Sequence, residues 1–343
     1  MKPFSKPSDI KVGVIGYGPS FDMGRIHLND MKHAGMVPTA VADIDPKRLE
    51  VARKDFPGIA TYSSAAEMLR KSDVHLLAVI TPHNSHARLA LQCLNAGRHV
   101  VTEKPFAVTT AECDAMITAA QRHRVMLSTF HNRHWDGWIV QAVKTLRTGV
   151  IGDVVRVECR MGSWAKPGDW WRSSKTIAGS ILHDWGVHLL EYTLQIVNSE
   201  ITEVSGYAHS GFWAPQTPWK QDTIEDEAAL VVRYASGAWS SLCMSGIESR
   251  TRPFWIEVTG TKGAYAFEHN SWELITHRGK HTVTTRGANP TTEWWRFYEN
   301  IAAHLTKGAK LVITPEWARR PIHIIDLALQ SAKAGRAISA TYR

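Results

Sequence analysis

The sequence contains few cysteines and no long apolar run, and each of these absences excludes a class of protein. The four cysteines lie far apart and form no CxxC pair or Cys/His cluster, so neither a disulfide framework nor a metal centre is expected. The first apolar run, residues 10–15, is too short for a signal sequence or a membrane span. We therefore expect a soluble, cytoplasmic protein with a reduced, metal-free interior.

Runs of like charge are also missing. The formal net charge is +8, but Lys and Arg exceed Asp and Glu by a small and similar margin before and after residue 131. The charges are interspersed, without the basic patch that follows a phosphate backbone, so we expect no binding to nucleic acid or to a membrane. An anionic cofactor requires no more positive charge than this.

Tryptophan is absent from residues 1–131, whereas all 14 tryptophans lie between Trp135 and Trp317. A chain of 343 residues is long enough for two hydrophobic cores. The uneven use of tryptophan predicts two domains with different roles, residues 1–131 and residues 132–343.

In the first domain, short β-branched runs alternate with longer helical patterns, which is typical of βαβ units and a parallel sheet. The predicted strands are 10–16, 37–43, 74–80, 98–102 and 125–130. The predicted helices lie near 22–34, 46–55, 63–71, 84–96 and 109–123. The pattern predicts an α/β domain with a doubly wound parallel sheet, the Rossmann fold.

The first predicted strand ends in Gly16-Tyr17-Gly18, where a Rossmann fold turns tightly and presents backbone N–H groups to a pyrophosphate. A strict GxGxxG motif requires glycine at position 21, where this chain has Phe21, and the next glycine, Gly24, comes three residues late. The sequence therefore predicts a nucleotide-binding turn followed by a short insertion, and leaves open which backbone groups contact phosphate.

The second predicted strand ends in Asp43, whose carboxylate can accept hydrogen bonds from ribose hydroxyls. Its charge would repel a 2′-phosphate, which favours NAD over NADP, although Lys47 and Arg48 are near enough to leave NADP open. As an alternative, Asp43 could cap the next helix, but Asp45, which directly precedes a proline, is better placed for that role.

Residues 178–197 read as one helix that begins near Gly179. Asp184, His188 and Glu191 are spaced i, i+4 and i+7, so they share one face of this helix. A histidine flanked by carboxylates suits a general base, because a carboxylate orients the imidazole and stabilises its charged form. The alternative is a solvated polar stripe, but most other residues of this helix are apolar, which argues against it.

The rest of the second domain is largely extended. After a helix near 134–147, strands are predicted at 154–160, 203–209, 226–235, 238–245, 254–260, 263–268 and 272–276. We expect an α+β domain with an open, mostly antiparallel sheet and the helix of residues 178–197 on one face. A sheet with one bare face predicts a homodimer or homotetramer. Most tryptophans then belong to the core or to an interface, and one or two of four candidates stack on a sugar: Trp164, Trp170, Trp171 and Trp185.

Several motifs along the chain resemble those of one family. They are Gly16-Tyr17-Gly18, Thr81-Pro82 with His86, Glu103-Lys104-Pro105, Asn132-x-x-Trp135, Trp171-Arg172 and Asp184-x-x-x-His188. Together they resemble the Gfo/Idh/MocA family of NAD(P)-dependent oxidoreductases, which act mainly on sugars, inositols and related polyols. The resemblance covers nearly the whole length.

The resemblance implies that Lys104, Asp184 and His188 form the catalytic group and that Glu103 faces the nicotinamide ribose. Without it, Glu103 and Lys104 would read as a surface ion pair worth about 0–1 kcal/mol. With Asp43, which is predicted from its place at the end of the second strand, the predicted cofactor contacts are Gly16, Tyr17, Gly18, Asp43, Thr81, Asn84, His86, Glu103, Asn132, Trp171 and Arg172. The substrate contacts that the resemblance implies are Lys104, Asp184 and His188; Trp164 is added as a ring that can stack on a sugar, and Glu191 because it shares the helix face of Asp184 and His188.

The expected activity is hydride transfer between a secondary hydroxyl of a sugar, inositol or polyol and NAD. Two alternatives remain from the sequence. An enzyme of this kind can retain NAD and cleave a glycoside or epimerise a sugar through a transient keto intermediate. A relative of this fold can also sense NAD without catalysis, although such a role does not require a lysine, an aspartate and a histidine at the catalytic positions.

Overall fold

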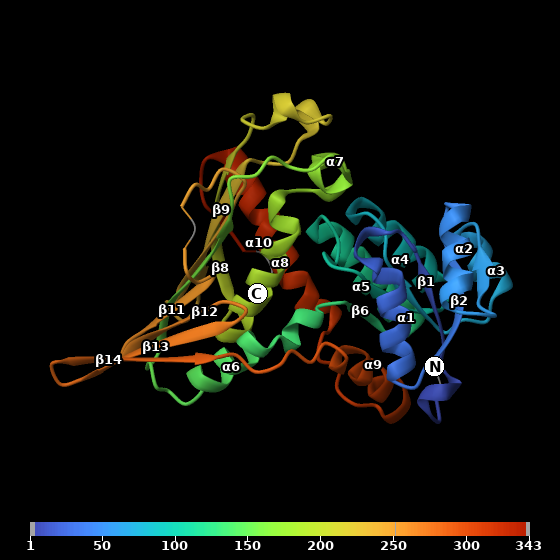
Figure 1. The fold of residues 1–343 in the computed structure, drawn as a ribbon, viewed down its shortest axis with the longest axis horizontal. Helices are drawn as coiled ribbons and strands as arrows, with labels where there is room; N and C mark the ends of the chain where they lie inside the picture. The colour runs from blue at the N-terminus through green and yellow to red at the C-terminus, as the bar shows by residue number, and fades with distance from the viewer. Residues whose placement is uncertain (1–3, 251, 341–343) are drawn as a thin grey trace. The chain divides into compact units, whose positions relative to one another are not determined.

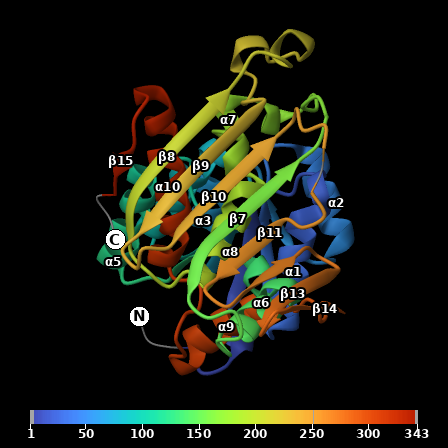
Figure 2. The ribbon, with the colours of Figure 1, turned by 90° about the vertical axis from the view of Figure 1, so that its left-hand side faces the viewer.

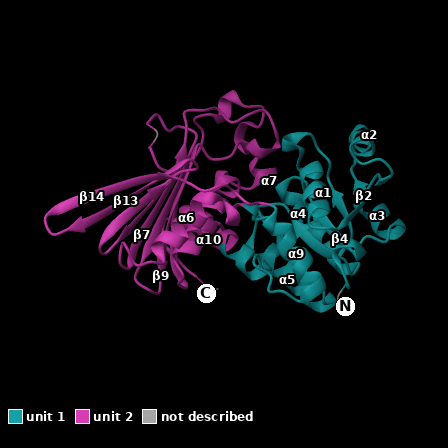
Figure 3. Ribbon diagram, turned by 60° about the horizontal axis from the view of Figure 1, so that its bottom comes forward, with its two compact units in different colours: residues 1–132, 295–320 teal, residues 133–294, 321–343 magenta. Residues whose placement is uncertain are grey.

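The computed structural model describes residues 4–250 and 252–340, which form two compact units (Figure 3). The first unit contains residues 1–132 and 295–320, and the second contains residues 133–294 and 321–343. The segment 295–320 comes late in the sequence and packs in the first unit. For this reason, the two units cannot be separated by cutting the chain at one point.

The first unit is built on a parallel sheet (Figure 1). Its strands in the described ranges are β1 (Lys11–Ile15), β2 (Val37–Ala42), β3 (Ala60–Tyr62), β4 (Leu76–Val79), β5 (His99–Thr102) and β6 (Leu127–Thr129). Their order is β3-β2-β1-β4-β5-β6, and each neighbouring pair is parallel. This is the strand order of a doubly wound nucleotide-binding fold, as predicted. The sequence did not indicate β3, which has three residues.

Helices connect these strands in the predicted alternation. They are α1 (Met23–His33), α2 (Pro46–Asp55), α3 (Ala65–Lys71), α4 (His86–Asn95) and α5 (Thr110–His123), and α9 (Arg296–Lys307) joins them from the late segment. Their starts follow local capping chemistry. Asp45 caps α2 by accepting from the Lys47 N–H at 2.9 Å, and Thr109 caps α5 in a capping box with Glu112.

The second unit is built on a large sheet whose bare face is seen in Figure 2. Its strands in the described ranges are β7 (Val154–Gly162), β8 (Ile201–His209), β9 (Glu227–Tyr234), β10 (Trp239–Ser245), β11 (Ile256–Gly260), β12 (Gly263–Phe267), β13 (Ser271–Arg278), β14 (His281–Ala288) and β15 (Ile338–Ser339). Their order is β14-β13-β12-β11-β7-β10-β9-β8-β15, with β7 and β10 parallel and the other pairs antiparallel. The mostly antiparallel sheet was predicted. The sequence did not indicate β14, which is largely exposed and polar, or the two-residue β15.

Helices cover one face of this sheet. They are α6 (Gly137–Leu146), α8 (Trp185–Ile196) and, from residue 321 onward, α10 (Pro315–Ala334) (Figure 2). A Cβ added at Gly186 of α8 would lie 3.4 Å from the Leu242 side chain of β10, so helix and sheet are in close contact. Leu242 therefore faces the helices, and its neighbours Ser241 and Cys243 face the bare side. Although α10 has 20 residues, the described ranges contain no helix with the length and hydropathy that a membrane crossing demands.

The prediction of one continuous helix over residues 178–197 is wrong. A short helix, α7 (Lys175–Ala178), ends at Gly179, whose φ of +90° is unfavourable for other residues. Ser180 then accepts a hydrogen bond from the Leu182 N–H at 3.2 Å and starts a separate 3-10 turn, residues 181–183. Asp184 follows with φ −87° and ψ −93°, outside the helical region, at the N-cap position of α8. His188 and Glu191 lie in α8, and Asp184 directly precedes it.

Candidate functional site

In the first unit, the carboxyl ends of β2, β1, β4 and β5 lie side by side along one edge of the sheet, which we call the carboxyl edge. The backbone N–H groups of Gly16, Ile80 and Glu103 each donate to a carbonyl of the neighbouring strand at 2.7–2.8 Å. These bonds continue the parallel pairing past the strand ends. Asp43 and Lys104, which follow β2 and β5, are consequently brought to the same edge, where open α/β sheets bind their ligands.

The turn after β1 requires glycine at one position and leaves room at another. Gly16 has a φ of +100°, and a Cβ there would lie 1.9 Å from the Ile80 carbonyl oxygen, so any side chain would collide with backbone. A Cβ at Gly18 would meet no atom within 4 Å among the described residues. The backbone at Gly18 is therefore open to close approach by a phosphate.

The insertion after Gly18 is accommodated by two residues with left-handed backbone. Phe21 and Asp22 have φ values of 59° and 51°, in a short 3-10 turn before α1. Helix α1 then brings Gly24 against Tyr17, where a Cβ would lie only 2.6 Å from the Tyr17 ring. Gly24 thus provides the close helix–strand packing of the third glycine in the Rossmann motif, three residues later than usual.

The Asp43 carboxylate is held in place from both sides. Its Oδ2 accepts from the Tyr17 N–H at 2.6 Å, and its Oδ1 accepts from the Asp45 N–H at 2.8 Å. The Arg48 Nε donates to the Tyr17 carbonyl at 2.7 Å, so a guanidinium lies at the same turn. Asp45, not Asp43, caps α2, in line with the sequence. Asp43 is half-buried and keeps further lone pairs for a ribose.

His86 joins the ends of β4 and β5. Its ring is fully buried, Nε2 lies 2.8 Å from the Thr81 carbonyl, and Nδ1 lies 2.8 Å from the Pro105 carbonyl. Burial lowers the pKa of His86, against the opposing effect of the two carbonyls. Thr81 also bonds Ser85 at 2.6 Å, and Asn84 is exposed. The ring therefore fixes the two loops relative to each other, and its direct contact with a cofactor stays a prediction.

Glu103 is held by groups that favour its charged form. Its Oε1 lies 3.1 Å from His27 Nε2, and its Oε2 accepts from the Lys104 N–H at 2.8 Å. Burial alone would raise the pKa of Glu103, but His27 and Lys104 outweigh it and bring the pKa below its ordinary value. His27 Nδ1 in turn lies 2.5 Å from the Tyr298 hydroxyl. No sequence pattern pointed to Tyr298, since 271 residues separate it from His27.

In the second unit, Asp184 is paired with Arg172. The Arg172 Nη1 donates to Asp184 Oδ1 at 2.5 Å, and the guanidinium lies 5.2 Å and 5.1 Å from the ring centroids of Trp170 and Trp171. Arg172, a predicted cofactor contact, is thus positioned by two aromatic rings to hold a predicted catalytic carboxylate. His188 lies one turn further on in α8, where it is 3% exposed.

Glu191 of α8 is buried and fully engaged by protein groups. His134 Nδ1 lies 2.6 Å from its Oε1, and Gln195 Nε2 donates to its Oε2 at 2.9 Å. The His134 bond fastens the middle of α8 to the turn Asn132–Trp135, which begins at the predicted cofactor residue Asn132, and the Gln195 bond lies within α8. A contact between Glu191 and substrate stays a prediction.

A second attachment of α8 was not predicted. The buried Asp136 carboxylate accepts from the Tyr192 hydroxyl and from Trp294 Nε1, both at 2.5 Å, and from Arg133 Nη1 at 3.3 Å. Burial raises the pKa of Asp136, and these three donors oppose the shift. The Arg133 guanidinium also lies 4.4 Å from the Trp185 ring centroid. Arg133 and Asp136 lie on either side of Trp135, a residue of the motif Asn132-x-x-Trp135. Their residue types alone did not indicate these partners.

Trp164, a predicted substrate contact, belongs to an aromatic cluster on the surface of the second unit. It is 56% exposed, and its ring centroid lies 5.4 Å from Phe212 and 5.6 Å from Trp213. Trp213 is buried and bonds the Gly246 carbonyl through Nε1 at 2.9 Å. The cluster therefore presents a fixed, exposed indole, which is suitable for stacking on a sugar.

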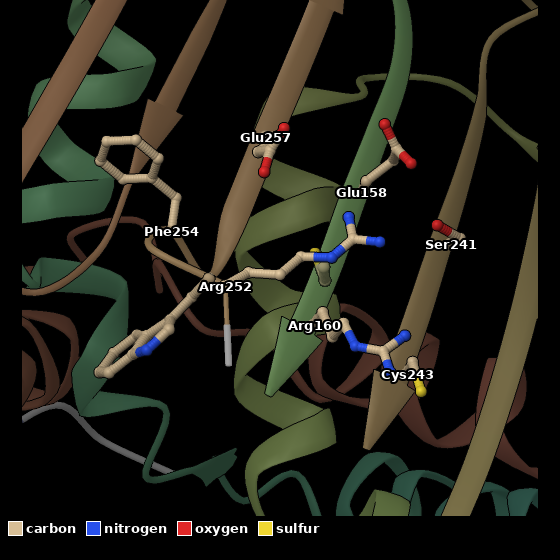
Figure 4. Close-up of a pocket in the computed structure, with 9 residues that line it drawn as sticks. Glu158, Arg160, Ser241, Cys243, Arg252, Phe254 and Glu257 are labelled. Atoms are coloured by element: carbon tan, nitrogen blue, oxygen red, sulfur yellow. The ribbon is translucent and has the colours of Figure 1, made fainter. Parts of the chain in front are cut away.

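A pocket on the bare face of the large sheet contains none of the predicted site residues (Figure 4). Side chains of β7, β10 and β11 line it, including Arg160, Cys243 and Glu257. Its volume of about 70 Å³ is well below the roughly 300–1,000 Å³ of ordinary ligand pockets. Arg160 forms an ion pair with Glu248 beside it. The pocket is too small for a sugar or a dinucleotide.

Comparison with known proteins gives two family matches. Residues 10–131 match the model described as "Oxidoreductase family, NAD-binding Rossmann fold", and residues 139–266 match the GFO/IDH/MocA C-terminal domain. The two matches follow each other along the chain and agree with the two kinds of sheet in the structure.

Two curated relatives and one solved structure illustrate the similarity. The scyllo-inositol 2-dehydrogenase (NADP(+)) IolW of Bacillus subtilis is 25% identical over 98% of both chains. The myo-inositol 2-dehydrogenase of Thermotoga maritima is 28% identical over 74% of both. The structure of levoglucosan dehydrogenase in complex with NADH and levoglucosan has a TM-score of 0.83 at 20% identity, covering 97% of this chain and 100% of that one, and supports the fold alone.

Proposed function

This chain belongs to the Gfo/Idh/MocA family of oxidoreductases, and we propose that it transfers a hydride between a secondary hydroxyl of a sugar, inositol or related polyol and NAD. The observation that carries the proposal is the carboxyl edge, where the glycine turn, the Asp43 carboxylate and the Glu103-Lys104 pair lie at the ends of neighbouring parallel strands. Relatives that act on inositols and levoglucosan support the substrate class.

The residues of this edge fit a dinucleotide. Gly16 permits the tight turn, Gly18 leaves its backbone open, and the N-terminus of α1 follows, as binding of a pyrophosphate requires. Asp43 is fixed at the end of β2, where it would accept from the adenosine ribose. NAD bound in this way supplies the hydride acceptor. We propose further contacts from the remaining predicted cofactor residues: Tyr17, Thr81, Asn84, His86, Glu103, Asn132, Trp171 and Arg172.

The catalytic residues would divide the work between a base and a cation. His188 takes the proton of the substrate hydroxyl. The hydrogen on the carbon that bears this hydroxyl leaves as hydride, and the alcohol becomes a carbonyl. Asp184, which forms an ion pair with Arg172, would orient the imidazole and stabilise its charged form. The Lys104 ammonium stabilises the negative charge that develops on the oxygen. Trp164 and Glu191 are proposed as additional substrate contacts.

The test is a screen of sugars, inositols, sugar acids and glycosides with NAD and NADP, read by the absorbance of the reduced cofactor. Lys104→Ala and His188→Ala should each lower turnover by about 10²–10⁴ while NADH binding is retained. The exposed Lys71→Ala is the matched control and should keep the parental rate. Parental turnover in both site variants would refute the assignment. Glycoside cleavage without release of NADH would favour the NAD-retaining alternative over net oxidation.

Cofactor preference should depend on Asp43. Its charge disfavours a 2′-phosphate, whereas Arg48 at the same turn would favour one once that charge is removed. We expect Asp43→Ser to raise the ratio of kcat/KM with NADP to kcat/KM with NAD by about tenfold or more. An unchanged ratio would contradict this role for Asp43.

We also propose that two or four copies of the chain associate through the bare face of the large sheet (Figure 2). Half-buried side chains of both charges and of apolar type lie on this face, among them Glu158, Arg160 and Val231. Size-exclusion chromatography with light scattering should give a dimer or tetramer, and Val231→Asp should shift it toward monomer. A monomeric parental protein would refute the proposal. The cytoplasmic location expected from the sequence stays a prediction.

A further inference from the structure

A line of hydrogen bonds in the first unit joins three side chains from three elements. The Tyr298 hydroxyl of α9 lies 2.5 Å from His27 Nδ1 of α1, and His27 Nε2 lies 3.1 Å from Glu103 Oε1 after β5. Glu103 Oε2 accepts from the Lys104 N–H at 2.8 Å. We call Tyr298, His27 and Glu103 the positioning chain, because it ends on the backbone of the proposed catalytic lysine.

The direction of these bonds follows from the chemistry of the groups. Burial raises the pKa of the Tyr298 phenol well above its ordinary value, and the charges of Asp30 and Glu103 add to the shift, so the hydroxyl keeps its proton. The Glu103 carboxylate can only accept, so the proton in that contact lies on His27 Nε2. In the tautomer with a bare Nδ1, the Tyr298 hydroxyl donates to Nδ1. With its proton on Nε2 and none on Nδ1, the ring donates one hydrogen bond and accepts the other.

The apolar surroundings make it energetically costly to bury the polar groups of His27 and Tyr298 without hydrogen-bond partners. His27 and Tyr298 are fully buried, and the Phe130 ring lies 4.2 Å from the His27 ring centroid. A buried polar group without a partner costs about 1–3 kcal/mol, whereas an apolar side chain of similar size has no such requirement. Packing alone would therefore favour leucine or phenylalanine at both positions. The line of hydrogen bonds ends at the Glu103 carboxylate, a charged group that needs donors to fix its position.

We propose that His27 and Tyr298 are positioning residues of the dehydrogenase, which fix the Glu103 carboxylate and through it the backbone that carries Lys104. This inference rests on the function proposed above. His27 donates on one side of the carboxylate and Lys104 on the other, so the carboxylate has one orientation. The titratable groups around the positioning chain are His27 and Asp30 in α1, His86 in α4, Tyr298 in α9 and Lys104 beside Glu103.

Three substitutions separate the parts of the chain. His27→Leu removes both bonds of the ring, His27→Gln keeps an N–H donor near the place of Nε2, and Tyr298→Phe removes a single oxygen. We expect His27→Leu to lower kcat by about 100-fold and Tyr298→Phe by about tenfold, because a displacement of about 1 Å at a reacting group costs about 100-fold. KM for the substrate should change less than kcat.

The pH profile distinguishes positioning from general damage. When Glu103 loses the His27 donor, its charged form is less favoured, so the acid limb of kcat/KM should move upward by about one pH unit or more in His27→Leu. His27→Gln should recover part of the rate and part of the limb. Phe130→Leu is the matched control, because it loosens the packing on His27 and leaves every polar group in place. It should lower stability without moving the limb.

A limb that moves equally in Phe130→Leu and His27→Leu would overturn the inference, as would parental kcat in both His27→Leu and Tyr298→Phe. A second measurement needs no turnover. The ¹⁵N imidazole shifts of His27 in the full-length protein should show a proton on Nε2, and a bare Nε2 with the proton on Nδ1 would overturn the inference. Because Lys104→Ala tests the proposed function independently, failure of one can be told from failure of the other.

Discussion

The attachment of α8 through Asp136 gives a prediction whose size follows from the contacts. The Tyr192 hydroxyl donates to the buried Asp136 carboxylate at 2.5 Å. A hydrogen bond to a charged group contributes about 1.5–3 kcal/mol, so Tyr192→Phe should lower the free energy of unfolding by about 2 kcal/mol. Asp136→Ala leaves Tyr192, Trp294 and Arg133 without their shared acceptor, and should cost about 3–5 kcal/mol.

The double variant Asp136→Ala/Tyr192→Phe tests whether these losses share one bond. Since the phenol has no acceptor left once Asp136 is removed, the double variant should be more stable than the sum of the single effects predicts, by about 1–2 kcal/mol. Guanidinium unfolding followed by tryptophan fluorescence is the assay. It reports mainly on the second unit, which contains every tryptophan except Trp295 and Trp317.

A second buried tyrosine in the same unit provides the control. The Tyr234 hydroxyl lies 3.0 Å from the neutral Ser240 hydroxyl. Tyr234→Phe should therefore cost less, about 1 kcal/mol, and should add to Asp136→Ala within about 0.5 kcal/mol. If Tyr192→Phe and Asp136→Ala were also additive, Asp136 would not hold α8 through Tyr192 and the reasoning would be refuted.

Three further predictions concern pH, packing and charge. Burial, with the charges of His304 and His75, lowers the pKa of His99 from 6.5 to about 4, so its protonation favours the unfolded chain. The free energy of unfolding should be highest above pH 6.5 and fall by about 3 kcal/mol toward pH 4. Thermal unfolding measured at a series of pH values should show a smaller fall in His99→Asn. Gly206→Ala would place a Cβ 2.0 Å from the Ala328 carbonyl oxygen and should cost about 2–3 kcal/mol in chemical unfolding; a cost below that of Ser205→Ala would contradict this close approach. Arg172→Ala should cost less than about 1 kcal/mol, because the pair is partly exposed, yet lower kcat about tenfold; unchanged kcat would argue against a role in holding Asp184.

The sequence by itself determined the parallel sheet and the connecting helices of the first unit, apart from β3 and the late segment 295–320. A half-buried strand shows an apolar period of two residues and a helix one of about 3.6 residues, so both can be read from short stretches of the chain. The capping residues Asp45 and Thr109 and the glycine turn at Gly16 were readable for the same reason, since each acts on its own backbone neighbours. The mostly antiparallel sheet of the second unit, apart from β14 and β15, also followed from extended runs along the chain.

Only the tertiary structure decided how distant residues combine. The periodic spacing of Asp184, His188 and Glu191 predicted one helix, but the positive φ of Gly179 and the Ser180 cap broke it. The contact of His27 with Tyr298 depends on the return of residues 295–320 to the first unit, across a separation of 271 residues. A local pattern cannot encode such a contact, because the energy that selects it arises from burial and pairing of side chains that the fold alone brings together.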